Sequence, residues 1–174
     1  RIVLDKYGES KEIKFNEDAY NAYGYYPTYK SEFVRISYES FITPPSILEY
    51  DFSKNKIYTR KEKKVLGGYN KEQYKSEKIY INAGDGTKVP VSLFYRKDLF
   101  KKDGTNPLLL YGYGSYGISQ YPSFNTGIFS LIDRGFVYAI AHIRGGSELG
   151  FKWYEGAKLL NKKRTFLDYI NCAE

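Results

Sequence analysis

The segment 108–117 reads LLLYGYGSYG, an apolar run that passes into glycines interleaved with tyrosines and one serine. Gly112, Gly114 and Gly117 have the spacing G-x-G-x-x-G of loops whose backbone amides bind phosphate. The same segment is one residue away from the G-x-S-x-G pattern of a serine nucleophile, because Tyr113 stands where the first glycine should be. The turn could therefore bind a phosphate, carry a nucleophile, or present a hydrogen-bond donor.

A dinucleotide site requires a helix that begins within the glycine motif, so that its N-terminal amides face the pyrophosphate. Here residues 118–122 intervene, and Pro122 disfavours helix before Ser123. The next predicted strand ends in His142 and Arg144, not in the acid that would bind a ribose. NADP binding, with a cation on the 2′-phosphate, is the one form of this hypothesis that stays open.

A nucleophile at Ser115 would need a small residue at position 113 to permit the strained turn, and Tyr113 is bulky. The single histidine of the chain, His142, lies within an apolar stretch. We expect it to be a packed strand histidine and not a catalytic base. These residues disfavour Ser115 as a nucleophile.

The third hypothesis is an oxyanion loop. Four strands are predicted around the turn, at 79–82, 89–95, 107–112 and 136–143. In α/β hydrolases the loop after the third strand supplies a donor for the tetrahedral intermediate, and the nucleophile comes later. A tyrosine hydroxyl on a glycine-rich turn is a suitable neutral donor, so the sequence favours this hypothesis.

The elements that position this turn have an α/β pattern. The continuous apolar run 107–114 predicts a strand buried on both faces. After it we expect a helix at 123–134 with a Gly135 C-cap, a strand at 136–143, a helical segment at 151–160 interrupted by Gly156, and a last helix at 166–174 opened by Thr165 and Asp168. This order predicts the beginning of a doubly wound parallel sheet, with ligand sites at the carboxyl ends of its strands.

The N-terminal part alternates with a period of two. Short strands are predicted at 33–41, 46–52 and 56–65, as in one sheet of a sandwich or one propeller blade. Residues 66–70 read as a linker. Asp85-Gly86 predicts a hairpin, and Pro90 in its second strand indicates an edge position.

Composition limits the function classes. Hydrophobic residues make up 42% and aromatic residues 18%, enough for a packed core. The net charge is +7, but the basic residues are dispersed among acids, and no RNA-binding signature is present, which disfavours nucleic-acid binding. The apolar runs are too short to span a bilayer and no secretory segment is visible. Cys172 is the single cysteine, which excludes an internal disulfide, and we expect it to be a small residue on a helix.

Three segments carry a resemblance to a known family: 76–98, 107–117 and 131–169. They closely resemble the prolyl oligopeptidase family of serine peptidases, and within it the oligopeptidase B group. The resemblance extends from about residue 33 to the last residue. It implies an α/β fold in which the N-terminal half of an α/β-hydrolase sheet follows the last strands of a β-propeller, with residues 1–72 in the propeller and 73–174 in the peptidase domain.

The resemblance also implies an activity: hydrolysis of peptides after arginine or lysine, with no metal or organic cofactor, no nucleic acid and no membrane as partner, in the cytoplasm. Tyr113 matches the tyrosine whose hydroxyl helps to form the oxyanion hole. Tyr116 matches an aromatic position near the substrate pocket, and Arg144 and Glu148 match a supporting loop.

The family's serine, aspartate and histidine are expected beyond Glu174. Since the chain begins at Arg1 and contains no methionine, we expect a piece of a longer protein, inactive by itself, that pairs with the remainder of the hydrolase domain. The alternative is a non-catalytic remnant or a binding piece from a split gene.

Overall fold

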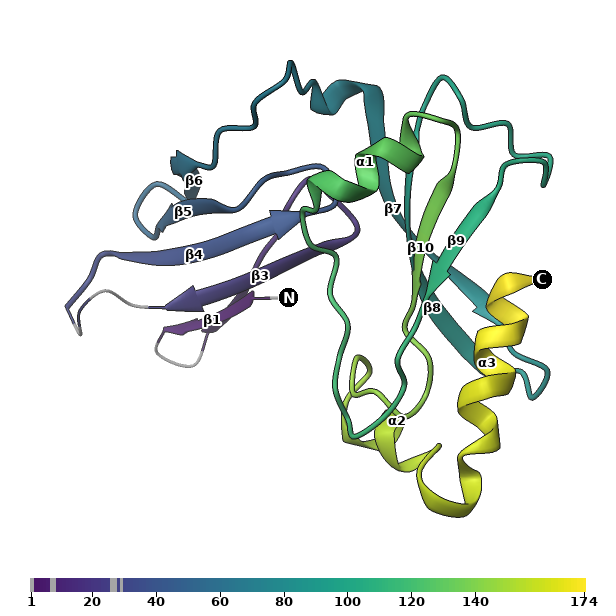
Figure 1. The fold of residues 1–174 in the computed structure, drawn as a ribbon. Coiled ribbons are helices and arrows are strands. Elements are labelled where there is room, and N and C mark those ends of the chain that lie inside the picture. Colours follow the sequence, from purple (N-terminus) through teal and green to yellow (C-terminus); the bar gives the residue numbers. More distant parts are fainter. Residues whose placement is uncertain (1, 7–8, 26–27, 29) are drawn as a thin grey trace.

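The computed structural model describes residues 2–6, 9–25, 28 and 30–174, and for residues 2–6 and 9–11 only the backbone. The described residues form a two-stranded hairpin and two four-stranded sheets. Figure 1 shows the two larger sheets beside each other, with the helices gathered around the second sheet. None of the helices in these ranges combines the length and the apolar character needed to cross a bilayer.

The first large sheet is antiparallel and contains β3 (Tyr20–Tyr25), β4 (Phe33–Ser40), β5 (Ser46–Asp51) and β6 (Lys56–Glu62), in that order. The predicted strands at 33–41, 46–52 and 56–65 are confirmed. The hairpin of β1 (Ile2–Lys6) and β2 (Glu9–Ile13) and strand β3 were not predicted. Burial along β4 alternates as the period-two pattern requires, because one face of the strand covers the core.

The second large sheet has the order β7-β8-β10-β9. Its strands are β7 (Tyr74–Asn82), β8 (Lys88–Arg96), β9 (Leu108–Tyr111) and β10 (Val137–Ala141). The Asp85-Gly86 hairpin between β7 and β8 is confirmed. Only β9 and β10 pair in parallel, whereas β8 is antiparallel to both of its neighbours. The sheet is therefore mixed, and the expectation of a parallel sheet holds only for β9 and β10, the pair joined through a helix.

Two expectations about strand positions were wrong. Strand β8 lies between β7 and β10, not at an edge. Its proline is tolerated because the pairing with β10 ends at Val91, the residue after Pro90: Pro90 O still accepts a hydrogen bond from His142 N (2.9 Å), and no N–H is returned. Strand β9 is not buried on both faces. It is the last strand of the sheet in the described ranges, and Leu108, Leu109 and Tyr111 are 39–44% exposed.

Helix α1 (Thr126–Ile132) is shorter than the predicted 123–134, because Asn125 caps its first turn and accepts a hydrogen bond from Gly127 N. Gly135 follows its end at a φ of +87°, as the predicted C-cap requires. The remaining helical elements are α2 (Phe151–Glu155), which ends at Gly156 as expected, α3 (Lys163–Ala173), and the short 3-10 turns η1 (Lys71–Gln73) and η2 (Leu159–Asn161).

The predicted N-cap pair of the last helix is wrong. Helix α3 begins at Lys163, so Thr165 and Asp168 lie inside it, and both side chains are buried. Each binds a group outside the helix: Thr165 Oγ1 donates to Arg144 O (2.8 Å), and Asp168 accepts from the Arg144 guanidinium. Tertiary hydrogen bonds, and not helix capping, explain why Thr165 and Asp168 are polar at these buried positions.

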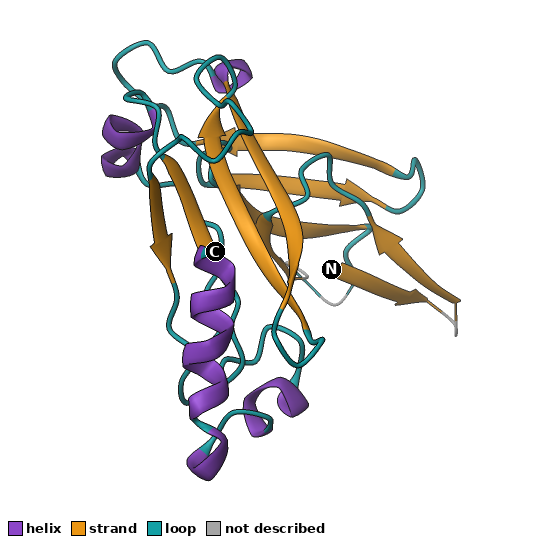
Figure 2. Ribbon diagram, turned by 90° about the vertical axis from the view of Figure 1, so that its right-hand side faces the viewer, coloured by secondary structure: helices purple, strands orange, loops and turns teal. Residues whose placement is uncertain are grey.

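Both faces of the second sheet are covered in its middle. On one face, Phe94 and Ile140 pack against Ile132 of α1. On the other face, Val89 and Ala141 form a cluster that Tyr169 and Cys172 of α3 cover. Two-sided burial explains why β8 and β10 are almost continuously apolar. Figure 2 shows α3, the helix that ends at the C-terminus, lying beside the sheet. Tyr169 of α3 donates to Leu110 O in β9, and Thr165 donates to Arg144 O in the loop after β10.

The two sheets meet through aromatic side chains. The rings of Phe41, which follows β4, and Phe94 of β8 stack with centroids 5.5 Å apart. The predicted linker 66–70 contains exposed Leu66, but it also contains Tyr69, whose hydroxyl donates to Ile42 O. The linker is therefore partly anchored to the core.

Candidate functional site

The glycine turn lies directly after β9, at the carboxyl end of the strand. Gly114 has a φ of +60° and Gly117 a φ of +66°, a backbone conformation that favours glycine. A Cβ at Gly114 would lie 2.5 Å from Thr165 Cγ2, so the turn is also packed too closely for any side chain there. Gly112 and Gly114 therefore allow the backbone of the turn to pack closely against Tyr169 and Thr165 of α3.

A second glycine loop, residues 144–150, follows β10 and interlocks with the first. Gly117 N donates to Gly145 O (3.0 Å), and Ser147 Oγ donates to Gly117 O (2.6 Å). Gly145 has a φ of +101°, and a Cβ on it would lie 2.1 Å from Gly114 O. The two loops therefore form one rigid unit, because neither can shift without breaking the other's contacts.

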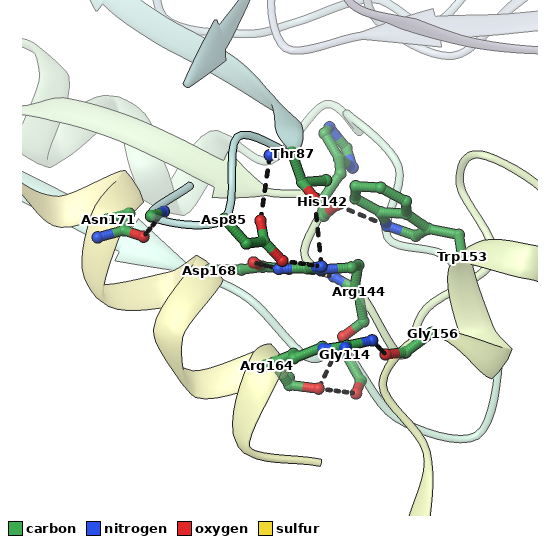
Figure 3. Close-up of polar contacts among 12 residues, drawn as sticks. Asp85, Thr87, Gly114, His142, Arg144, Trp153, Gly156, Arg164, Asp168 and Asn171 are labelled. Carbon is green, nitrogen blue, oxygen red and sulfur yellow. Dashed lines mark hydrogen bonds and ion pairs between the residues drawn. The ribbon is translucent and has the colours of Figure 1, made fainter. Parts of the chain in front are cut away.

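Arg144, which the sequence assigned to a supporting loop, is buried at the base of this unit. Its Nε donates to Asp168 Oδ2 (2.8 Å) and its Nη2 to Asp168 Oδ1 (2.5 Å). Its Nη1 donates to Asp85 Oδ2 (2.6 Å) in the turn between β7 and β8. Figure 3 shows Asp85, Arg144 and Asp168 pointing toward one another from three separate elements.

Electrostatics keep this arginine charged. Its hydrogen bond to Asp168 is the largest cause of the raised pKa of Arg144, and its hydrogen bond to Asp85 holds the pKa of that carboxyl well below its ordinary value. Thr87 adds further hydrogen bonds to Asp85. The cluster joins the hairpin, the second loop and α3, which is a structural role and leaves Arg144 without a free face for a substrate.

Glu148 supports the other end of the unit. Its Oε1 accepts a hydrogen bond from Gln120 N (2.9 Å), just beyond the glycine turn, and lies 3.8 Å from Nδ1 of His142. His142 is buried, as the sequence predicted, and its Nε2 is 2.7 Å from Ser92 Oγ. Within the described ranges His142 Nδ1 and Glu148 Oε2 are buried without a hydrogen-bond partner. Glu148 thus holds the segment after the turn through Gln120 N and lies beside His142, which directly follows β10.

The two predicted site tyrosines lie on the outside of this unit. Tyr113 is 42% exposed and Tyr116 is 82% exposed, and Tyr116 has a φ of +54°, rare for a residue with a side chain. The structure brings Tyr113 and Tyr116 together on one turn and places Arg144 and Glu148 behind them. The two pairs are joined through backbone, not through direct contact of their side chains.

The phosphate and nucleophile hypotheses find no support in this geometry. Helix α1, the next helix along the chain, begins only at Thr126, so the glycine motif does not itself open a helix whose N-terminal amides could face a pyrophosphate. Ser115 Oγ accepts a hydrogen bond from Lys162 Nζ (2.7 Å), whereas His142 is bound to Ser92 on the sheet. Within the described ranges, no three histidine, cysteine or acidic side chains gather as metal ligands would.

Sequence reasoning missed three residues of the unit: Lys162, Asp168 and Asp85 in their tertiary roles. A lone aspartate in the apolar stretch 165–170 could have indicated a buried partner, because an unpaired charge is costly to bury. Lys162 lies among other basic residues and gave no such signal. Cys172 packs against the core on α3, as expected, and burial raises the pKa of its thiol to about 11.

Comparison with known proteins agrees with this architecture. The prolyl oligopeptidase family matches residues 122–174. Dipeptidyl aminopeptidase BI of Pseudoxanthomonas mexicana is 41% identical over 99% of this chain and 24% of its own length. Protease 2 of Moraxella lacunata is 34% identical over 96% of this chain and 24% of its own. Oligopeptidase B from Trypanosoma brucei, solved with covalently bound antipain, superposes with a TM-score of 0.81 at 41% identity, covering 94% of this chain and 23% of its own.

The family match, the curated relatives and the solved structures all point to one family of proteins. The chain belongs to the prolyl oligopeptidase family, and its relatives include oligopeptidase B and protease 2. The chain spans about a quarter of the length of the curated relatives that match it over nearly all of its residues.

Proposed function

We propose that this chain is part of a serine oligopeptidase in which Tyr113 donates a hydrogen bond to the oxyanion. In this proposal residues 73–174 form the first half of an α/β-hydrolase peptidase domain, and residues 1–72 form the end of a β-propeller. Support comes from the mixed sheet of β7–β10, from the separate antiparallel sheet of β3–β6, and from the likeness to solved oligopeptidases over most of the chain.

The observation that carries the proposal is the presentation of Tyr113. It stands between Gly112 and Gly114 just beyond β9, with an exposed phenol on a turn whose backbone is locked from behind by the second glycine loop. Catalysis of acyl transfer gains most from donors that are held in place before charge develops. A hydroxyl on a rigid turn meets this requirement, and it needs no metal or organic cofactor.

The nucleophile, its histidine and its aspartate are proposed to lie in other parts of the protein, which would pair with this chain along the edge of β9. That edge has no strand beside it in the described ranges, and Leu108 and Leu109 of β9 are partly exposed. An apolar strand edge of this kind gains stability when a further strand pairs with it.

For the substrate we propose peptides cleaved after arginine or lysine, in the cytoplasm, with Tyr116 beside the pocket and with Arg144 and Glu148 supporting the loops. The named relatives support this unevenly: two solved neighbours are oligopeptidase B, whereas other relatives are a dipeptidyl aminopeptidase and prolyl endopeptidases. The rates of hydrolysis of three fluorogenic substrates should therefore be compared: one with arginine before the cleaved bond, one with proline there, and one that releases an N-terminal dipeptide. A preference for the prolyl substrate would refute cleavage after arginine or lysine.

The role of Tyr113 is tested by Tyr113→Phe in the full-length gene product, which removes one hydroxyl and keeps the ring. Loss of one oxyanion donor should lower kcat about tenfold to a thousandfold, with a much smaller change in KM. Tyr121→Phe is the matched control, because Tyr121 is 57% exposed in the segment that follows the turn. An unchanged kcat in Tyr113→Phe would remove this tyrosine from the mechanism.

A further inference from the structure

Lys162 contacts the glycine turn from the N-terminal end of α3. It lies between η2 and α3, and its Nζ donates hydrogen bonds to Gly114 O and to Ser115 Oγ, the latter at 2.7 Å. Both acceptors belong to the residues that directly follow Tyr113. A single ammonium group therefore binds the backbone and the side chain of adjacent positions in the turn.

The charge of Lys162 is not neutralised by an acid. Among the residues that the structure describes, its Nζ forms no ion pair, although ion pairs occur at several other basic side chains. Burial lowers the pKa of this lysine, as expected for a cation moved away from water without a counter-charge. The ammonium group lies 6.0 Å from the centroid of the Phe166 ring, and its hydrogen bonds to the turn are the closer contacts that hold it there.

These hydrogen bonds fix a peptide plane. The peptide unit between Gly114 and Ser115 is planar and trans, so holding Gly114 O also fixes the direction of the Ser115 N–H on the other side. Glycine at a φ of +60° has many other conformations available, and the flanking Gly112 adds more freedom. Without Lys162, Gly114 O would keep a long contact with Thr165 Oγ1 (3.5 Å) and the turn would keep its packing against the second loop, so we expect a partial loss of order around Tyr113.

We propose that Lys162 is a positioning residue of the oxyanion loop: by binding Gly114 O and Ser115 Oγ, it fixes the direction in which Tyr113 presents its hydroxyl. This inference rests on the proposed function for its catalytic part. Its structural part, that Lys162 holds the turn, stands on the hydrogen bonds alone.

The structural part is tested by hydrogen exchange in the full-length gene product. Lys162→Met keeps much of the stem and removes the ammonium group, and Lys163→Met is the control because Lys163 is the exposed neighbour. The reporters are two amides of the turn, Gly117 N, which donates to Gly145 O, and Ile118 N, which donates to Ser115 O. Lys162→Met should speed their exchange about tenfold, since a hydrogen bond to a charged group is lost, and Lys163→Met should not. Equal exchange in both variants would overturn the inference.

The catalytic part is tested by peptide hydrolysis. Lys162→Met should lower kcat about tenfold with KM within about twofold, because the group acts on the transition state through Tyr113. In a Tyr113→Phe background the same change should have almost no further effect on kcat. A full additional loss in that background would show a general structural role and overturn the positioning role. If Tyr113→Phe leaves kcat unchanged, the proposed oxyanion donor fails, whereas faster exchange in Lys162→Met still supports the anchoring of the turn.

Discussion

Asp168→Asn is the most informative perturbation of this fold. Asp168 has no exposed surface and accepts three hydrogen bonds from Arg144: one from its backbone N (3.0 Å), one from Nε and one from Nη2. Asparagine has nearly the same shape but no charge. At one of these contacts its amide NH2 would face an N–H of Arg144, so two donors would meet without an acceptor. The buried guanidinium would then keep a neutral acceptor in the remaining amide oxygen and its contacts with Asp85 and Thr87, but it would lose its buried counter-charge.

The expected loss of stability follows from the burial of the pair. Breaking a buried ion pair by removing one partner costs about 3–5 kcal/mol, because the remaining charge stays buried. Asp85→Asn removes the other carboxylate, but its side chain is 45% exposed, so water can replace it and the loss should be about 0–1 kcal/mol. The two variants change the same arginine and differ mainly in burial, which makes them a matched pair.

Urea unfolding followed by the fluorescence of Trp153 measures both variants, since Trp153 is the one tryptophan of the chain and its Nε1 donates to His142 O (3.0 Å). Gly145 N also donates to Trp153 O, so the reporter sits beside Arg144. A loss in Asp168→Asn below about 1 kcal/mol, or a loss equal to that of Asp85→Asn, would refute the argument from burial.

Two further predictions concern the same unit. Gly114→Ala should lower the free energy of unfolding by about 2–4 kcal/mol, because its Cβ would lie 2.5 Å from Thr165 Cγ2 at a φ of +60°. Gly86→Ala, at a φ of +79° with open space around the Cβ, should lower it by only about 1 kcal/mol, and equal urea midpoints for the two would contradict the packing argument. The hydrogen bond from Arg144 holds the pKa of Asp85 below its ordinary value of 3.8, so the ionised carboxylate stabilises the fold above that pH and the contribution is lost on acidification. Asp85→Asn should therefore flatten the fall in stability between roughly pH 4 and 2, and an unchanged pH profile would show that the contact is weak in solution.

Local sequence patterns predicted much of the fold. The alternation in 33–41 identified β4 because a half-buried strand must alternate, and Asp85-Gly86 identified the hairpin because few residue pairs adopt that turn. The apolar stretch 136–143 identified β10. These signals depend on neighbours within the chain, so they can be read without knowing what packs against them.

Predictions failed where a distant element decided the outcome. Pro90 indicated an edge strand, but β10 pairs with β8 only as far as Val91, the residue that follows the proline, and this depends on where β10 ends. Thr165 and Asp168 had the spacing of a helix cap, but Arg144 binds both from another loop. A polar residue that forms hydrogen bonds with a distant segment can have the same sequence spacing as one that caps a helix, so the sequence does not distinguish the two.

The sequence by itself determined the strands from β4 onward, the hairpin between β7 and β8, and the position of the glycine turn after the third strand of its sheet. It also carried the resemblance that led to Tyr113, since these features depend on periodicity and on motifs of adjacent residues. Only the tertiary structure decided why the turn is rich in glycine and what holds it. Gly114 and Gly145 pack backbone against backbone, and Lys162 and Ser147 bind carbonyls of the turn from other parts of the chain. Those contacts join residues far apart in sequence, and such contacts exist only when the sheet and α3 have folded together.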